Sequence, residues 1–254
     1  MWILFGGSHF LLSGTPLRAW IVERHGPRGF TIVFATVTVI TMLGLIFATA
    51  IYGGGGHPGF GFGAYPAAHY GLGGVSTIGA VLAIAGLINY PRSPMAILAQ
   101  RQRERPKHAN FALSPPSAIE RVARHPFFVG LAIMMAAHAL LASTLASAVY
   151  FGGYVVFAVI GIPFQDRKLR LRWKNNYAAF EAETSNIPFA SKTAERQNPE
   201  WGRWMLAVLI TVLLFGVLHP VWMYGTGAGF GGLILLFGLL GVARGLATSS
   251  NTTS

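Results

Sequence analysis

Long apolar stretches recur along the whole chain, and they restrict its fold more than any other feature. A helix of about 20 mostly apolar residues crosses the hydrocarbon core of a bilayer. The sequence predicts seven such spans: 2–19, 29–52, 70–90, 127–146, 148–164, 203–223 and 227–246. These stretches are continuously apolar and do not alternate, which argues against a closed barrel. We therefore expect an all-α, polytopic membrane bundle of about seven transmembrane helices.

Charged residues are scarce. Lys and Arg number 19 and Asp and Glu number 8, so charged side chains make up 11% of the 254 residues. A soluble domain carries about a quarter, and this difference excludes a soluble globular protein. No segment between the spans is large enough for a separate soluble domain, so residues 1–254 are predicted to form a single membrane domain. Cysteine is absent, which excludes disulfides and thiolate ligands.

The positions of the charges predict an orientation. Nearly all Lys and Arg lie in three segments between spans, 20–28, 91–126 and 165–202, and the rest lie at the adjoining helix ends. The segments on the opposite side hold none: 53–69, 147 and 224–226. The positive-inside rule then places the N-terminus outside and the C-terminus in the cytoplasm, as expected for a bacterial-type inner membrane protein. The net charge of +11 thus indicates a membrane orientation, and we predict no nucleic-acid partner.

Two segments outside the spans have a distinct composition. The predicted outer loop 53–68 reads GGGGHPGFGFGAYPAA, and we expect it to have no fixed secondary structure, as a flexible connector or a mobile lid. The predicted cytoplasmic segment 165–202 begins with a helical composition. Its apolar residues fall on one helix face, which predicts an amphipathic helix on the inner membrane surface: Leu169, Trp173, Tyr177 and Phe180.

Four of the eight histidines lie within an apolar span or at its mouth: His9, His125, His138 and His219. An ionisable group is costly in hydrocarbon, so each of these is a candidate functional residue. His219 precedes a proline and is expected at a helix kink. The other four lie in loops or at helix edges, where contact with solvent is expected: His25, His57, His69 and His108.

His9 and His138 are predicted at similar depths. With a rise of 1.5 Å per residue, His9 lies roughly 16 Å and His138 roughly 18 Å from the inner ends of their spans. Two imidazoles at one depth can ligate opposite faces of a haem or share a smaller metal ion. Haem is favoured over zinc because no carboxylate or thiol accompanies them. The alternative is that each imidazole hydrogen-bonds to a backbone carbonyl or to a Ser or Thr on a facing helix.

The sequence Arg124-His125-Pro126-Phe127-Phe128-Val129-Gly130 opens the fourth span. Proline suits the first position of a helix, where its missing N–H is not needed. The two preceding cations are predicted to point toward the headgroup region. There they would hold a carboxylate or phosphate, or act as interfacial anchors.

This motif resembles membrane methyltransferases of the isoprenylcysteine carboxyl and phospholipid type. The resemblance continues downstream at Asp166, Leu169, Tyr177, Phe180, Ile187 and Pro188. It implies an S-adenosylmethionine-dependent enzyme that methylates a lipid or prenylated substrate at the inner face. Arg124, His125 and Asp166 would then hold the cofactor.

A longer resemblance is to the NnrU family and its relative zeta-carotene isomerase. The matching residues cover most of the chain: Ser8-His9, Leu17-Arg18-Ala19-Trp20, Phe30–Thr38, Arg124-His125-Pro126, Ala136-Ala137-His138, Asp166-Arg167, Ile187-Pro188-Phe189-Ala190, Glu195-Arg196-Gln197 and His219-Pro220. The resemblance implies a haem b protein with His9 and His138 as iron ligands, and Met135 at the position of an alternative ligand.

The activity that this second resemblance implies is a redox-gated cis–trans isomerisation of a carotenoid-like polyene, which would enter from the bilayer. His9 and His138 would be the catalytic residues. Arg124 and His125 are further candidates for cofactor binding, and Phe127, Phe128 and Asp166 for substrate binding. NnrU proteins themselves are associated with nitric oxide reduction and denitrification, which implies, as an alternative, an accessory protein or a redox or NO sensor.

Overall fold

The computed structural model describes residues 1–13, 15–89, 116–191 and 201–219. It divides into two compact units, Met1–His57 with His219, and Pro58–Leu218. Every described element is a helix, which confirms the predicted all-α class. Three described helices are long and apolar enough to cross a membrane: Pro16–Tyr52, Pro66–Ile88 and Leu145–Leu171. Three more are apolar but shorter, and the predicted span 227–246 lies outside the described residues.

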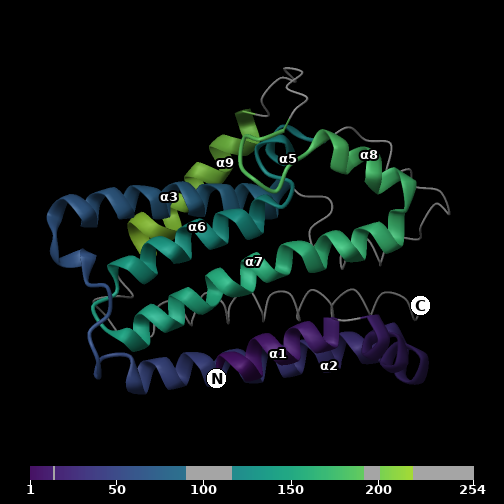
Figure 1. The fold of residues 1–254 in the computed structure, drawn as a ribbon, viewed down its shortest axis with the longest axis horizontal. Helices are drawn as coiled ribbons and strands as arrows, with labels where there is room; N and C mark the ends of the chain where they lie inside the picture. The colour runs from purple at the N-terminus through teal and green to yellow at the C-terminus, as the bar shows by residue number, and fades with distance from the viewer. Residues whose placement is uncertain (14, 90–115, 192–200, 220–254) are drawn as a thin grey trace, which may run out of the picture. The chain divides into compact units, whose positions relative to one another are not determined.

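The first unit is built from α1 (Trp2–Ser13) and α2 (Thr15–Tyr52), which lie side by side (Figure 1). Gly26 interrupts α2 with φ 69° and ψ 172°, a conformation essentially restricted to glycine. Pro27 then begins the second helical part, where it needs no N–H partner. The prediction that residues 20–28 form a segment between helices is therefore wrong. These residues belong to α2, and only Gly26 among them is non-helical.

Aromatic and aliphatic side chains join the helices of this unit. The ring of His9 on α1 lies 4.8 Å from the ring of Phe34 on α2, centroid to centroid. A small core forms around Leu12, Ile21 and Phe30. The guanidinium of Arg18 lies 5.2 Å from the centroid of the Phe30 ring and makes a cation–π contact with this core residue.

The second unit centres on α3 (Pro66–Asn89), α6 (Pro126–Leu141) and α7 (Leu145–Trp173). α6 packs against both of the others, and α9 (Trp201–Thr211) packs against α3 (Figure 1). The seven residues after α9, Val212–Leu218 (η2), are π-helical. With 16 residues, α6 is shorter than the predicted span 127–146, and α7 extends well beyond the predicted 148–164.

Three glycines let α3 and α6 approach to backbone contact. A Cβ on Gly130 would lie 2.3 Å from the backbone nitrogen of Ala83, and one on Gly79 would lie 2.6 Å from that of Met134. A Cβ on Gly86 would meet the backbone of Phe127 at 2.5 Å. Close packing of small residues is a main source of helix association in lipid, so this contact forms the centre of the unit.

The second part of the predicted outer loop has a defined structure, which corrects the expectation for residues 53–68. Gly59 N donates to Ser143 O (2.9 Å) and Gly61 N donates to Ala142 O (2.9 Å). A short 3₁₀ turn, Phe62–Ala64 (η1), follows. A Cβ on Gly59 would lie 2.6 Å from the carbonyl oxygen of Thr144, so glycine is required for this approach. The loop therefore docks on the turn between α6 and α7.

The predicted amphipathic helix is divided in the structure. α7 continues to Trp173, Lys174 adopts a positive φ of 46°, and α8 (Asn175–Glu183) begins after it. Leu169, Tyr177 and Phe180 are buried in one cluster between the two helices. Three of the four predicted apolar side chains therefore pack against one another across the break at Lys174, and the prediction of a single amphipathic helix is wrong.

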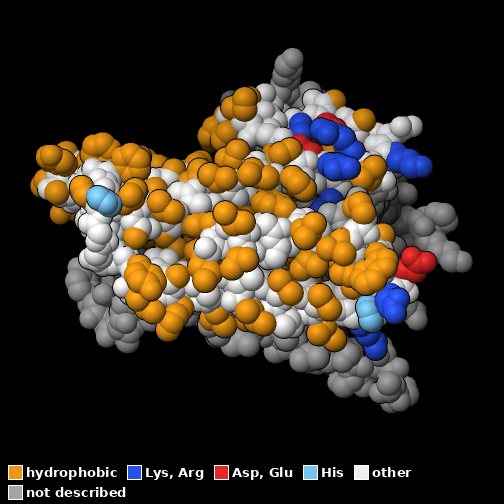
Figure 2. All heavy atoms as spheres, turned by 60° about the horizontal axis from the view of Figure 1, so that its bottom comes forward, with side chains coloured by type: hydrophobic (Ala, Val, Ile, Leu, Met, Phe, Trp, Pro, Cys, Tyr) orange, Lys and Arg blue, Asp and Glu red, His pale blue; other side chains and the backbone are white. Residues whose placement is uncertain are grey.

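Large hydrophobic side chains are exposed in both units, for instance Ile40 at 62% and Phe47 at 69% in the first and Ile78 at 67% in the second. Figure 2 shows hydrophobic side chains over much of the visible surface. Exposed apolar side chains on long apolar helices are what contact with lipid tails requires, in agreement with a membrane protein.

Candidate functional site

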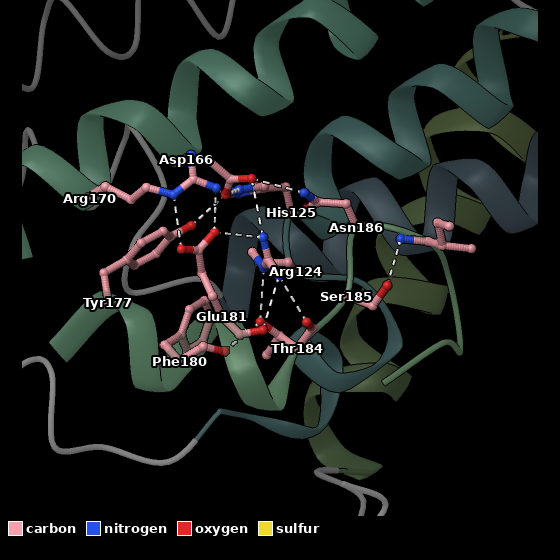
Figure 3. A network of polar contacts seen from close by, with 11 residues as sticks. Arg124, His125, Asp166, Arg170, Tyr177, Phe180, Glu181, Thr184, Ser185 and Asn186 are labelled. Atoms are coloured by element: carbon pink, nitrogen blue, oxygen red, sulfur yellow. Dashed lines mark hydrogen bonds and ion pairs between the residues drawn. The ribbon is translucent and has the colours of Figure 1, made fainter. Parts of the chain in front are cut away.

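A network of charged and polar side chains joins the start of α6 to the end of α7 and to α8 (Figure 3). Arg124 and His125 directly precede α6. Asp166 lies on α7, and Tyr177 and Glu181 lie on α8. The resemblance to methyltransferases predicts that Arg124, His125 and Asp166 lie together, and in the structure Asp166 hydrogen-bonds to both of the other two.

Every N–H group of the Arg124 guanidinium has an acceptor. Nε donates to Thr184 Oγ1 (3.0 Å), and Nη1 donates to Asp166 Oδ2 (3.2 Å) and Glu181 Oε1 (3.1 Å). Nη2 donates to the backbone oxygens of Glu181 (3.1 Å) and Thr184 (2.9 Å). A guanidinium has five N–H donors, so the side chain is saturated.

The Asp166 carboxylate is saturated in the same way. Its Oδ1 accepts from His125 Nε2 (2.6 Å) and from the Tyr177 hydroxyl. Its Oδ2 accepts from Arg124 Nη1 and from Asn186 Nδ2 (2.9 Å). A carboxylate offers about four lone-pair sites, and all four are used. His125 is fully buried, so this hydrogen bond satisfies a polar ring nitrogen in the interior.

A second ion pair extends the network to the surface. Arg170 on α7 donates through Nη2 to Glu181 Oε1 (2.7 Å) and through Nε to Glu181 Oε2 (2.9 Å). Two guanidinium groups, one before α6 and one on α7, therefore pair with the carboxylates of Asp166 on α7 and Glu181 on α8. The backbone adds a further contact, because Arg124 N donates to Ser185 O (2.6 Å).

This network acts as a clamp that holds the end of α7 and the segment after α8 against the start of α6. It corrects the expectation that Arg124 and His125 point toward lipid headgroups, because both are directed inward at partners within the chain. In the methyltransferase interpretation, Arg124, His125 and Asp166 hold a cofactor. In the structure they hydrogen-bond to one another.

His138 lies on α6, three residues before the helix ends at Leu141. Its Nδ1 lies 2.9 Å from the backbone oxygen of Met134 and 3.2 Å from Ser76 Oγ on α3. The ring also lies 5.1 Å from the ring of Phe151 on α7, centroid to centroid. Three helices of the second unit thus contribute to the surroundings of this imidazole.

The contact with Met134 fixes the tautomer of His138. A carbonyl oxygen can only accept, so Nδ1 must carry the proton that it donates. In the neutral ring Nε2 then carries the lone pair. Histidines that ligate metals commonly donate their other ring N–H to a backbone carbonyl in this way. The arrangement also agrees with the simpler expectation from the sequence, a hydrogen bond to a backbone carbonyl and to a serine.

His9 lies in the first unit among aromatic rings. Besides Phe34, its ring lies 6.0 Å from Phe5 and 6.1 Å from Phe10, centroid to centroid. Within the described residues no three His, Cys, Asp or Glu side chains group as a site for a metal ion. This finding does not bear on haem, whose protein ligands number at most two.

The remaining predicted site residues lie on α6. Met135 is fully buried one turn before His138. Phe128 contacts Gly161 of α7, where an added Cβ would lie 2.8 Å from its ring, and the backbone of Phe127 lies against α3. These contacts give the Phe128 ring a packing role, and the contact of either phenylalanine with a substrate stays a prediction.

Four residues of these contacts were not predicted from the sequence: Ser76, Glu181, Thr184 and Asn186. Glu181 could have been found as a candidate partner of Arg124. The sequence holds only eight acidic residues, and a buried arginine requires a partner of opposite charge. Three of the histidines predicted in contact with solvent are exposed, namely His25, His57 and His69, and His108 lies outside the described residues.

Comparison with known proteins gives one match. The NnrU protein family matches residues 1–226, which is most of the 254-residue chain. No curated protein and no solved structure matches the chain. The family match covers the described parts of both units, including His9, the Arg124 clamp and His138. The chain therefore belongs to the NnrU family.

Proposed function

We propose that this protein is a haem-b-binding integral membrane protein in which His138 is an axial ligand of the iron. The observation that carries the proposal is the contact between His138 Nδ1 and the backbone oxygen of Met134, at 2.9 Å. It selects the neutral tautomer whose Nε2 lone pair is the donor that iron requires. The ring is also held by Ser76 and Phe151, which limits its rotation.

The chemistry around His138 suits haem better than a bare metal ion. The helix that carries it is apolar over its whole length, and its neighbours include Met134 and the ring of Phe151. A porphyrin needs an apolar surrounding and one or two nitrogen ligands, whereas zinc needs three or four protein ligands. The clamp at Arg124 lies at the opposite end of α6 and supports this helix from its first turn.

The second ligand that we propose is His9, on the sequence argument of equal depth. Its aromatic neighbours Phe5, Phe10 and Phe34 give it an apolar surrounding of the kind that a porphyrin requires. The activity that we propose is the cis–trans isomerisation of a conjugated polyene taken from the bilayer. Bound haem would supply electron density that lowers the double-bond order of the polyene and so permits rotation.

The test is a titration of the purified apoprotein with haemin, followed by absorbance. We expect a Soret band that saturates at a fixed stoichiometry, and a loss of affinity of at least tenfold in His138→Ala. His69→Ala is the matched control, since His69 is exposed on α3 of the same unit. Saturable binding that is equal in wild type and in His138→Ala would overturn the assignment.

Activity is tested separately with a cis-polyene in detergent, under reducing and oxidising conditions. Isomerisation that requires the reduced, haem-loaded protein supports the enzyme. Stoichiometric haem without any turnover would instead support the accessory or sensor role that the sequence left as an alternative.

A further inference from the structure

We propose that the segment after α8, residues 184–191, anchors this end of the second unit in the membrane surface by inserting the side chains of Ile187 and Phe189. Ile187 is 70% exposed and Phe189 is 82% exposed. Both lie outside the helices of the unit, so they are not part of an exposed helix face that spans the membrane. The proposed contact is with lipid at the boundary between headgroups and acyl chains, and it is independent of haem.

Hydrogen bonds hold the backbone of this segment before and after Ile187. At its start, Arg124 N donates to Ser185 O (2.6 Å), as part of the clamp. Further along, Phe189 N donates to Val122 O (2.8 Å). The segment is therefore tied at two points to the residues that precede α6, and its two large apolar side chains are held at the surface.

The backbone at Phe189 is unusual for a phenylalanine, because its φ is +61°. Glycine adopts this left-handed conformation without strain and asparagine or aspartate tolerates it, whereas a bulky residue adopts it rarely. A turn that contacts only water would form more easily with one of those three residues. Phe189 adds backbone strain and contributes little internal packing, since most of its surface is exposed. Burial of the ring in lipid would offset both costs.

The segment lies level with the ends of two apolar helices. Val122, which accepts one of its hydrogen bonds, is four residues before Pro126, where the apolar helix α6 begins. On α7, Asp166 accepts from Asn186 Nδ2 (2.9 Å), and it lies about 7.5 Å along the helix from the end of the apolar part at Leu171. Headgroups begin where apolar spans end, so the segment is placed at the membrane surface.

The charges at this end of the unit also favour lipid as the partner. Exposed cations lie on the last turns of α7 and directly after it: Arg167, Arg170 and Lys174. Anionic headgroups attract such cations, and apolar side chains next to them then enter the acyl boundary. A second copy of the chain would bring the same cations to the contact, and like charges repel.

The test uses single-cysteine variants of the full chain, which contains no cysteine of its own. Ile187→Cys and Phe189→Cys are labelled with the fluorophore NBD and reconstituted into vesicles of phosphatidylethanolamine and phosphatidylglycerol. Both native side chains are largely exposed, so neither substitution removes a buried contact. Ala182→Cys is the matched control, an exposed position on α8 at the same end of the unit. Ile78→Cys, exposed on the apolar helix α3, supplies the signal of a label in lipid.

We expect the labels of Ile187→Cys and Phe189→Cys to emit at shorter wavelength than that of Ala182→Cys, as the Ile78→Cys label does. A lipid with a nitroxide close to its headgroup should quench both labels, and iodide in the water should quench them only weakly. The Ala182→Cys label should respond in the opposite way, with strong quenching by iodide and weak quenching by the lipid.

Two results would overturn the inference. Strong quenching of both labels by iodide, without quenching by the nitroxide lipid, would place Ile187 and Phe189 in water. Emission at short wavelength that neither quencher reduces would show that protein covers them, either a second copy or another segment of the chain. Quenching by the nitroxide lipid supports the anchor whether or not the protein binds haem.

Discussion

Replacing Asp166 with asparagine tests the clamp at the start of α6. The substitution keeps the shape of the side chain but leaves one oxygen in place of two. The amide nitrogen must then face either Arg124 and Asn186, where it meets N–H donors, or His125 and Tyr177, where both hydrogen bonds must reverse their direction. In either arrangement the Arg124 guanidinium loses a carboxylate partner. Removing one partner of a buried ion pair costs about 3–5 kcal/mol.

For a chain of this size that loss corresponds to a fall in Tm of roughly 6–20 °C. The assay is thermal unfolding in detergent, followed by circular dichroism. Glu183→Gln is the matched control, since its carboxylate lies 3.6 Å from Arg121 and is 41% exposed. An exposed pair contributes at most about 1 kcal/mol. If Asp166→Asn unfolds within the range of this control, the network does not clamp the helices.

Three further predictions follow from other contacts. Gly130→Ala should destabilise the second unit by about 1–3 kcal/mol, because the added Cβ would overlap the backbone of α3. Gly152→Ala is the control, since its Cβ would meet open space, and equal melting temperatures of the two variants would contradict the packing of α3 on α6. Gly26→Ala should lower the free energy of unfolding by about 1–3 kcal/mol because residue 26 has a positive φ, with Gly7→Ala as the control. An unchanged stability would show that residue 26 does not adopt this conformation. Calorimetry with S-adenosylmethionine should give no binding to wild type, since Arg124 and Asp166 already bond to each other, and a saturable isotherm would refute this.

The helices were predictable because their cause is local. In lipid a backbone segment must satisfy its own hydrogen bonds, and a helix does so. A long apolar run therefore predicts a membrane-spanning helix. The break at Gly26 was less accessible, because a Gly-Pro pair between two apolar runs permits either a loop or a single-residue turn. The docking of Gly59 on the turn after α6 depends on an approach between distant segments, and no local signal distinguishes that glycine from its neighbours.

Part of the clamp was predictable from the sequence, and its function was not. The motif around Arg124 and the acid at Asp166 indicated that these residues belong together. Whether such a pair binds a cofactor or each other depends on the remaining hydrogen-bond acceptors. The sequence did not show that Glu181 and Thr184 contact Arg124. Ser76 escaped notice because it is one small residue in an apolar span, and its contact with His138 depends on the register between α3 and α6.

The reduced-minus-oxidised absorbance spectrum tests the proposed binding of haem through His138. The measurement uses protein purified from haem-replete cells, with His138→Ala prepared in parallel. Wild type should show a Soret band and a sharpened visible band on reduction, and His138→Ala should lose most of this signal. A colourless wild-type protein, or a spectrum that is unchanged in His138→Ala, would contradict it.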